Sequence, residues 1–165
     1  MTTQNSRVPA GGVVVIGSLS KATQDRLEKA ANGKFAKVAD SPLTHMVEIS
    51  GGDLRKFSER INKVVGTEGV VAPMLADDEG NRLLPTGTMQ VRFKSPPSDD
   101  LLADFAMRHK VELAQRNKWS PQQAEFAVRT DDLRYFPDVA AELEKDKTVV
   151  SAWPDVRAAF RREKA

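Results

Sequence analysis

Few residues in this sequence have the types and spacing that catalysis requires. Cysteine is absent, which excludes thiol nucleophiles, disulfides and thiolate zinc sites. The only histidines, His45 and His109, are far apart in the sequence and fall on different expected elements. This separation argues against a multi-histidine metal centre and against a histidine-based triad. We therefore expect a protein that is not an enzyme and that uses no cofactor or metal.

The acidic and glycine-containing stretches also lack the patterns of ligand sites. The run Asp77-Asp78-Glu79 has no alternating oxygen ligands ending in a bidentate glutamate, as a calcium loop would. The pair Asp131-Asp132 is typical of a turn or a helix start. Gly11 and Gly12 precede the first expected strand and only Gly17 follows it, so the phosphate-binding glycine fingerprints are missing. We expect ordinary turns at these places.

The first half of the chain predicts a strand, a helix, two strands, a helix and a strand. Ser20 is placed to cap the first helix, and Asp53 to start the second, in which apolar residues recur at intervals of three and four. The expected strands are residues 13–16, 34–39, 44–49 and 70–75, and the expected helices are residues 21–31 and 53–65.

The same order is expected again in the second half. Ser98 is placed to cap a helix as Ser20 does, and equivalent landmarks such as these two serines lie about 78 positions apart. The expected strands are residues 89–94, 111–115, 124–128 and 149–153, and the expected helices start near residues 99 and 137.

Two βαββαβ halves predict an α+β protein made of two tandem ferredoxin-like units, each an antiparallel sheet with its helices on one face. The polar stretch Asp77–Asn81 marks the boundary, and Leu83–Gly87 is read as a lead into the second unit. We therefore expect a first unit at residues 1–80 and a second at residues 81–165.

The sheet faces that carry no helices decide what the protein could bind. In the first unit the strand at residues 13–16 is apolar on both sides, so its outer face should be covered by the second unit or by another protein. In the second unit the outward positions are polar, and this face is expected to be solvated or to meet a polar partner. These positions are Arg92, Lys94, Glu112, Arg116, Glu125 and Arg129.

Nucleic acid is the less favoured partner. The chain has 25 Lys and Arg against 23 Asp and Glu, a net charge of +2, which is small for a protein that neutralises phosphates. Ferredoxin-like sheets that bind RNA stack bases on aromatic residues of the central strands. The expected third strands, residues 44–49 and 123–129, contain one aromatic residue, Phe126, and the alternation of its strand points it toward the core. Trp119 and Trp153, near strand ends, are expected to be packing residues.

No targeting signal is expected. The N-terminus is polar, and the apolar run Val13–Ile16 is too short for a secretory core or a membrane span. The prediction is a cytoplasmic protein that does not enter a membrane.

The residues after Trp153 allow two interpretations. Pro154 in a first turn, followed by Ala- and Arg-rich sequence, favours a short helix. An extended segment is the alternative, and such a segment could add to the edge of a partner's cleft.

Short motifs in residues 86–160 resemble the propeptides of subtilisin-type proteases and their stand-alone inhibitor relatives. The resemblance lies in Thr88–Lys94 (TMQVRFK), Ser98–Leu102 (SDDLL), Arg108–Val111 (RHKV) and Lys147–Asp155 (KTVVSAWPD). Lys110 stands where the family often has glycine. The first unit resembles the family in element order and in Gly69-Val70-Val71.

This resemblance implies a non-catalytic partner of a subtilisin-like serine protease, or of a downstream protease domain in a longer precursor. The open sheet face would pack on surface helices of the protease, and the tail would enter its active-site cleft as an inhibitor or folding chaperone. The implied tail is Val156, Arg157, Ala158, Ala159 and Phe160, with Phe160 at the primary specificity pocket. The alternative is a protein-interaction or assembly module of the same fold without protease binding.

Overall fold

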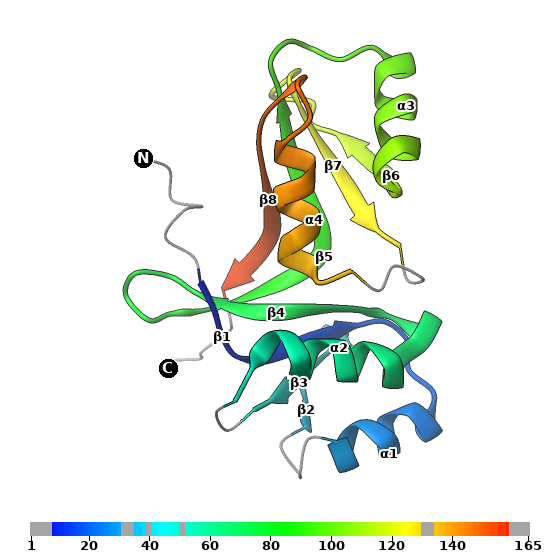
Figure 1. Ribbon diagram of the computed structural model, residues 1–165, viewed down its shortest axis with the longest axis vertical. Helices are drawn as coiled ribbons and strands as arrows, with labels where there is room; N and C mark the ends of the chain where they lie inside the picture. Colours follow the sequence, from blue (N-terminus) through cyan, green and yellow to red (C-terminus); the bar gives the residue numbers. More distant parts are fainter. Residues whose placement is uncertain (1–7, 31–34, 39–40, 50–51, 130–133, 159–165) are drawn as a thin grey trace.

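Two βαββαβ units follow one another in the computed structural model, as the sequence repeat predicts (Figure 1). The structure describes residues 8–30, 35–38, 41–49, 52–129 and 134–158. The acidic pair Asp131-Asp132 lies outside these ranges.

The first unit contains four strands and two α-helices. Ser20 Oγ accepts a hydrogen bond from the backbone N–H of Thr23 at 3.2 Å, and Asp53 caps the second helix through the N–H of Lys56. Both expected helix starts are therefore confirmed. The elements are β1 (Val8–Ile16), α1 (Lys21–Ala30), β2 (Phe35–Val38), β3 (Ser41–Glu48), α2 (Leu54–Val65), the 3-10 turn η2 (Gly66–Glu68) and β4 (Val70–Ala76).

The second unit repeats this order. Ser98 Oγ caps its first helix by accepting from the N–H of Leu101 at 3.0 Å. The elements are β5 (Arg82–Phe93), α3 (Asp99–His109), β6 (Val111–Arg116), β7 (Gln123–Val128), α4 (Phe136–Glu144) and β8 (Val149–Ala158).

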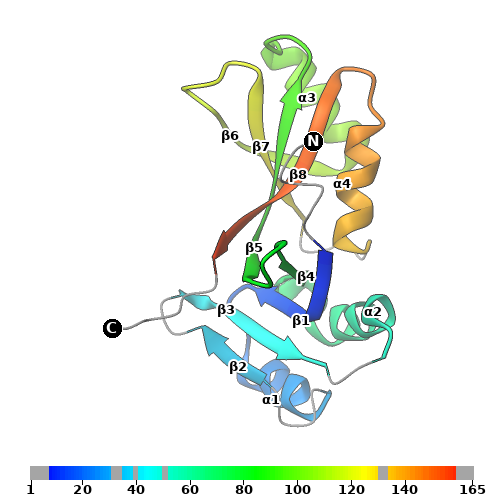
Figure 2. The same ribbon diagram turned by 90° about the vertical axis from the view of Figure 1, so that its left-hand side faces the viewer.

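Both sheets are antiparallel, and both have the ferredoxin-like strand order. The first runs β2-β3-β1-β4 and the second β6-β7-β5-β8, so the first and third strands of each unit are central. Each unit's two helices cover one face of its sheet (Figure 2). The fold class predicted from the sequence is confirmed.

The two sheets are joined into one hydrogen-bonded network of eight strands. A hairpin connects β4 to β5 with Leu75 opposite Leu83 and Ala76 opposite Arg82. Its turn is organised by Asp77, whose carboxylate accepts from the N–H groups of Glu79 and Asn81. This part of the acidic run is therefore a turn, and the units share a continuous backbone ladder.

β5 starts earlier than the sequence indicated, and this difference changes how the units meet. Leu83–Gly87, interpreted as a lead into the second unit, is the first half of β5. Leu84 is 1% exposed and packs with Val14 and Met74 of the first unit. The apolar outer face of the first sheet is therefore covered from within the chain.

β1 also starts earlier, so Gly11 and Gly12 lie inside it rather than before it. The register of β1 against β4 shifts between Pro9 and Val13, which marks a β-bulge. Gly12 has φ +148°, and a Cβ there would lie 2.2 Å from the carbonyl oxygen of Val47. These glycines are therefore required by the backbone geometry of β1.

Each unit has its own core between helices and sheet. The second core is built on aromatic rings: the centroid of Phe105 on α3 lies 5.1 Å from that of Phe93 and 5.0 Å from that of Phe126. Phe126 is fully buried, as its parity predicts. The first core gathers Val13, Val15, Leu27, Val47, Phe57, Ile61, Val65 and Val71.

α3 ends at a residue in an unfavourable conformation. Lys110 has φ 59° and ψ 41°, the left-handed region that commonly ends a helix and that favours glycine. In the described part of the chain it is the only non-glycine residue with positive φ. Lys110, at the position where propeptides often have glycine, thus adopts the left-handed conformation that glycine would adopt without strain.

Candidate binding surface on the second unit

The sheet of the second unit has one face without helices, which we call the open face. Side chains on the central strands alternate between the core and this face: Met89, Val91 and Phe93 are buried, whereas the residues between them are half-buried or exposed. The open face consists of Thr88, Gln90, Arg92, Glu112, Gln115, Gln123, Glu125, Ala127, Ser151, Trp153 and Asp155.

Side-chain hydrogen bonds link neighbouring strands of the open face. Thr88 Oγ1 donates to Glu125 Oε2 at 2.6 Å, and Thr86 Oγ1 donates to Asp155 Oδ2 at 2.8 Å, with 3.1 Å between the two threonine oxygens. Gln115 Nε2 donates to Glu125 Oε1 at 2.9 Å. These bonds hold the side chains of the face in fixed positions.

Two further bonds link the amides in the middle of the face. Gln123 Nε2 donates to Gln90 Oε1 at 2.9 Å, and Gln90 Nε2 donates to Asp155 Oδ1 at 3.3 Å. The centre of the face is therefore occupied by polar side chains that hold one another in place. This is the surface of a sheet that either stays in water or meets a polar partner.

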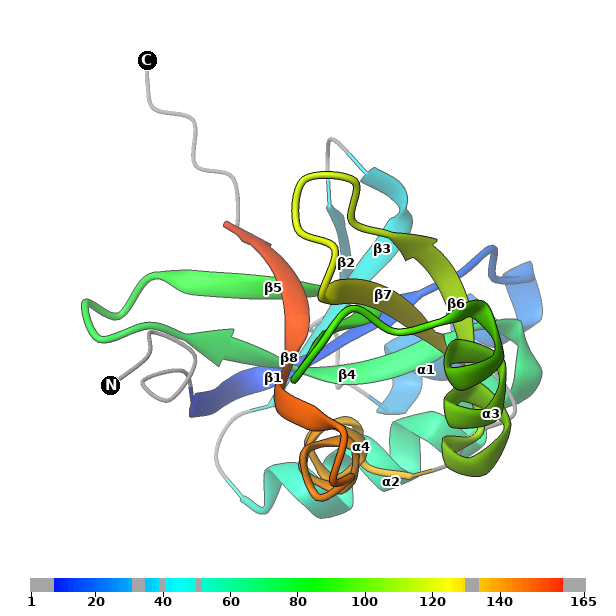
Figure 3. The ribbon, with the colours of Figure 1, turned by 90° about the horizontal axis from the view of Figure 1, so that it is seen from above.

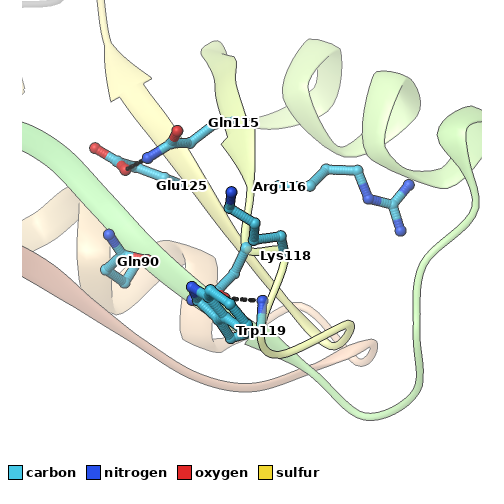
Figure 4. Close-up of a pocket in the computed structure, with 7 residues that line it drawn as sticks. Gln90, Gln115, Arg116, Lys118, Trp119 and Glu125 are labelled. Atoms are coloured by element: carbon cyan, nitrogen blue, oxygen red, sulfur yellow. Dashed lines mark hydrogen bonds between the residues drawn. The ribbon is translucent and has the colours of Figure 1, made fainter.

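A hollow of about 260 Å³ opens at the edge of this face (Figure 4). It is lined by Gln90, Gln115, Arg116, Asn117, Lys118, Trp119 and Glu125. These residues come from the central strands β5 and β7, from β6 and from the β6–β7 loop. The hollow is therefore continuous with the middle of the open face.

Trp119, on the β6–β7 loop, is 86% exposed, so the expectation that it packs in the core is wrong. Its loop is nevertheless ordered by Asn117, whose Oδ1 accepts from the N–H groups of Trp119 and Ser120 at 2.8 and 3.0 Å. Lys118 Nζ lies 5.7 Å from the centre of the indole ring. The sequence placed this tryptophan near a strand end, but the Asn117 turn that turns it outward was not anticipated.

The predicted polar positions fall partly on the open face. Arg92, Glu112 and Glu125 lie there as expected. Arg116 does not, because β6 shifts register between Leu113 and Gln115 and the guanidinium turns to Asp99 Oδ1 at 2.9 Å. Lys94 and Arg129 follow the ends of their strands.

The expected tail is only partly within the described residues. Val156, Arg157 and Ala158 belong to β8 and pair with Pro85, Leu84 and Leu83 of β5, respectively. The helical alternative is therefore wrong for this stretch. Ala159 and Phe160 lie outside the described residues.

The histidines hold structural positions in different units. His109 Nε2 lies 2.8 Å from Asp146 Oδ2, at the contact between α3 and the turn before β8, whereas His45 is buried in β3. Within the described ranges, no group of three or more potential ligands is arranged to hold a metal ion. Across the same ranges, no helix has the length and apolar character needed to cross a membrane.

Comparisons with known proteins add little. No protein-family model matches the sequence, and a search of curated proteins finds no match. Among solved structures, the chain is similar to RNA recognition domains 1 and 2 of Sex-lethal from Drosophila melanogaster. The TM-score is 0.27 and the identity 13%, over 90% of this chain and 99% of that chain. Similarity at this level carries no argument about what this chain binds.

Proposed function

We propose that this chain is a non-catalytic, propeptide-like partner of a subtilisin-like serine protease, acting as inhibitor or folding chaperone. The open face of the second unit would dock on the protease, and the tail from Val156 to Phe160 would enter the active-site cleft. A protein that binds the folded protease but not its unfolded chain shifts the folding equilibrium toward the folded state.

The observation that supports this proposal most is the position of β8. This strand borders the open face and stays extended through Ala158. In the described sheet it pairs with β5 along one edge, which leaves its other edge for a partner. An extended segment of this kind can add to a strand of a protease cleft, where backbone bonds give affinity and pockets select side chains.

The test is an inhibition assay with several subtilisin-like proteases and two versions of the chain, the full sequence and one ending at Phe160. Phe160→Asp should weaken inhibition by more than about tenfold, or roughly 1.4 kcal/mol, because the side chain would enter an apolar pocket. Met107→Asp is the matched control, since it adds the same charge at a residue that is 75% exposed on α3, on the helix-covered side. It should leave the inhibition constant unchanged.

Two results would count against the proposal. If neither version inhibits any of the proteases, the alternative of an interaction or assembly module without protease binding takes its place. If Phe160→Asp inhibits as well as the unmodified chain, the tail assignment is wrong even though a protease binds.

RNA binding fits the open face less well. The face carries three carboxylates, Glu112, Glu125 and Asp155, against one cation, Arg92, and carboxylates repel phosphates. A binding constant for single-stranded RNA that falls steeply with salt would nonetheless favour RNA over the protease.

A further inference from the structure

We propose that Glu144 and Pro154 close the outer edge of β8, and that without them this edge would pair with the same edge of a second copy of the chain. This role of the two residues is independent of the proposed function. It follows from which backbone groups of β8 point away from β5 and from what each of them meets.

β8 is an edge strand in the described part of the sheet. It pairs with β5 along its inner edge, and among the described strands none pairs with its outer edge. An unpaired edge presents a row of N–H and C=O groups to which another chain can add a strand. Such an edge must be closed if copies of the protein are to remain separate.

Two hydrogen bonds show which residues of β8 face outward. The N–H of Ala152 donates to Glu144 Oε2, on α4, at 3.1 Å, so the backbone of Ala152 points away from β5. The C=O of Asp155 accepts from Thr86 Oγ1, on β5, at 3.3 Å, so the backbone of Asp155 points toward β5. Backbone groups alternate in direction along a strand. The outward residues are therefore Ala152, Pro154, Val156 and Ala158.

The direction of β5 agrees with this assignment. The N–H of Phe93 donates to the carbonyl of Gln122, which directly precedes β7, at 2.7 Å. Val91, two residues earlier in β5, therefore also directs its backbone groups toward β7. Ala152 is opposite Val91 in the register, so its own N–H is not used by β5.

The outward positions in the upper part of β8 are closed. A pairing strand would have to displace the Glu144 carboxylate from the N–H of Ala152, and Pro154 has no N–H to donate. The register also shifts where Val150 is an extra residue in β8, and such a bulge interrupts pairing. In the described part of the strand, Val156 and Ala158 are the outward positions without such protection. Two positions offer too few hydrogen bonds to join two sheets.

A second copy of the chain is the partner that the opened edge would fit. An edge strand is complementary to itself when two copies lie antiparallel, because outward N–H groups then meet outward C=O groups across a two-fold axis. With Glu144 and Pro154 replaced, the outward positions from Ala152 to Ala158 would form one uninterrupted row. The two sheets could then continue into one another.

Hydrogen exchange of the whole chain, followed for each amide, tests the closed state. The N–H of Ala152 should exchange slowly although no described strand pairs with it, whereas those of Val156 and Ala158 should exchange fast. Glu144→Ala should accelerate exchange at Ala152 by at least about tenfold and leave Trp153, which is opposite Gln90 of β5, nearly unchanged. Equal exchange at Ala152 in the two proteins would overturn the role of Glu144.

Sedimentation of a double variant tests the opened edge. Glu144→Ala combined with Pro154→Val should self-associate at least about tenfold more tightly than the unmodified chain. Exchange at Val156 and Ala158 should slow as the concentration of the double variant rises. Glu28→Ala, which removes an exposed carboxylate from α1, is the control and should not change the association. Circular dichroism and thermal unfolding establish that each variant is folded.

Three results would overturn the inference. The double variant might associate no more tightly than the unmodified chain. It might associate while exchange at Val156 and Ala158 stays fast, in which case another surface is used. The unmodified chain might itself associate with slowed exchange at these two residues, which would mean that the edge is not closed.

Discussion

Arg55 of the first unit and Asp138 of the second form a two-point ion pair across the boundary between the units. The guanidinium nitrogens of Arg55, on α2, lie 2.7 and 3.0 Å from the two carboxylate oxygens of Asp138, on α4. The guanidinium also lies 4.4 Å from the centre of the Tyr135 ring. Seen from above, α4 is viewed end-on over α2 (Figure 3), so this pair joins a helix of one unit to a helix of the other.

Replacing Arg55 should therefore affect orientation more than stability. Both side chains are about half exposed, and exposed ion pairs contribute little to the free energy of unfolding. We expect Arg55→Met to change the relative alignment of the two units in residual dipolar couplings while the melting temperature stays close to that of the unmodified chain. Arg55→Lys, which keeps the charge and loses the two-point geometry, should give an intermediate change. Identical couplings in all three proteins would show that the β4–β5 hairpin sets the angle alone.

Asp146 should make the stability of the second unit depend on acid pH. Burial alone would raise the pKa of this carboxyl, which is 4% exposed, but hydrogen bonds from His109, Thr148 and Arg108 outweigh it and hold the pKa well below its ordinary value of 3.8. A carboxyl with a lowered pKa in the folded state stabilises the fold above its unfolded pKa, and this contribution disappears as the pH falls through the folded value.

Asp146→Asn should lower the free energy of unfolding by about 1–3 kcal/mol at pH 7, because four donor groups on Arg108, His109 and Thr148 lose a charged acceptor. Its unfolding free energy should also fall less steeply than that of the unmodified chain from about pH 4 downward. Urea unfolding at pH 7, 4, 3 and 2 measures both effects. Parallel pH curves for the two proteins would contradict the assignment.

Lys110→Gly should stabilise the protein. A left-handed conformation costs an L-residue roughly 1–2 kcal/mol, and glycine avoids this cost but loses more entropy on folding. The net gain should be about 0.5–1 kcal/mol. Lys145→Gly is the control, since Lys145 ends α4 with φ −77° and should not gain stability. A lower melting temperature for Lys110→Gly would mean that the lysine side chain contributes more than its conformation costs.

Leu84→Ala should destabilise both units together. Leu84 belongs to the second unit by sequence but packs with Val14 and Met74 of the first. Removal of a buried leucine side chain costs about 2–5 kcal/mol. We expect hydrogen exchange to become faster in β1 and β4 as well as in β5. Faster exchange confined to β5 would show that the contact does not couple the units.

Local signals made most of the fold predictable from the sequence. Ser20, Asp53 and Ser98 each cap a helix through an N–H group three residues further along the chain. The alternation of apolar and polar residues around Val91 likewise indicates the strand in which it lies. The extent of β5 was not predictable in this way, because Pro85 and Gly87 are typical of a connection. Long-range pairing with β4 and β8, together with the packing of Leu84, makes the stretch a strand.

The candidate surface was less predictable for a similar reason. The parity of Glu125 and Phe126 follows from simple alternation and was predicted. The positions of Arg116 and Trp119 depend on a register shift and on a turn closed by Asn117, and neither has a strong signature in the sequence. The hollow arises where these two irregularities meet.

The hairpin between β4 and β5 has a consequence for any attempt to study one half of the molecule. Producing the two halves separately, with the division between Ala76 and Arg82, would leave every strand complete. Leu84 would nevertheless lose its contacts with Val14 and Met74, and these two side chains would become exposed. Each isolated half would expose an apolar surface and should aggregate at concentrations at which the intact protein does not. We therefore expect the two repeats to unfold as one cooperative unit.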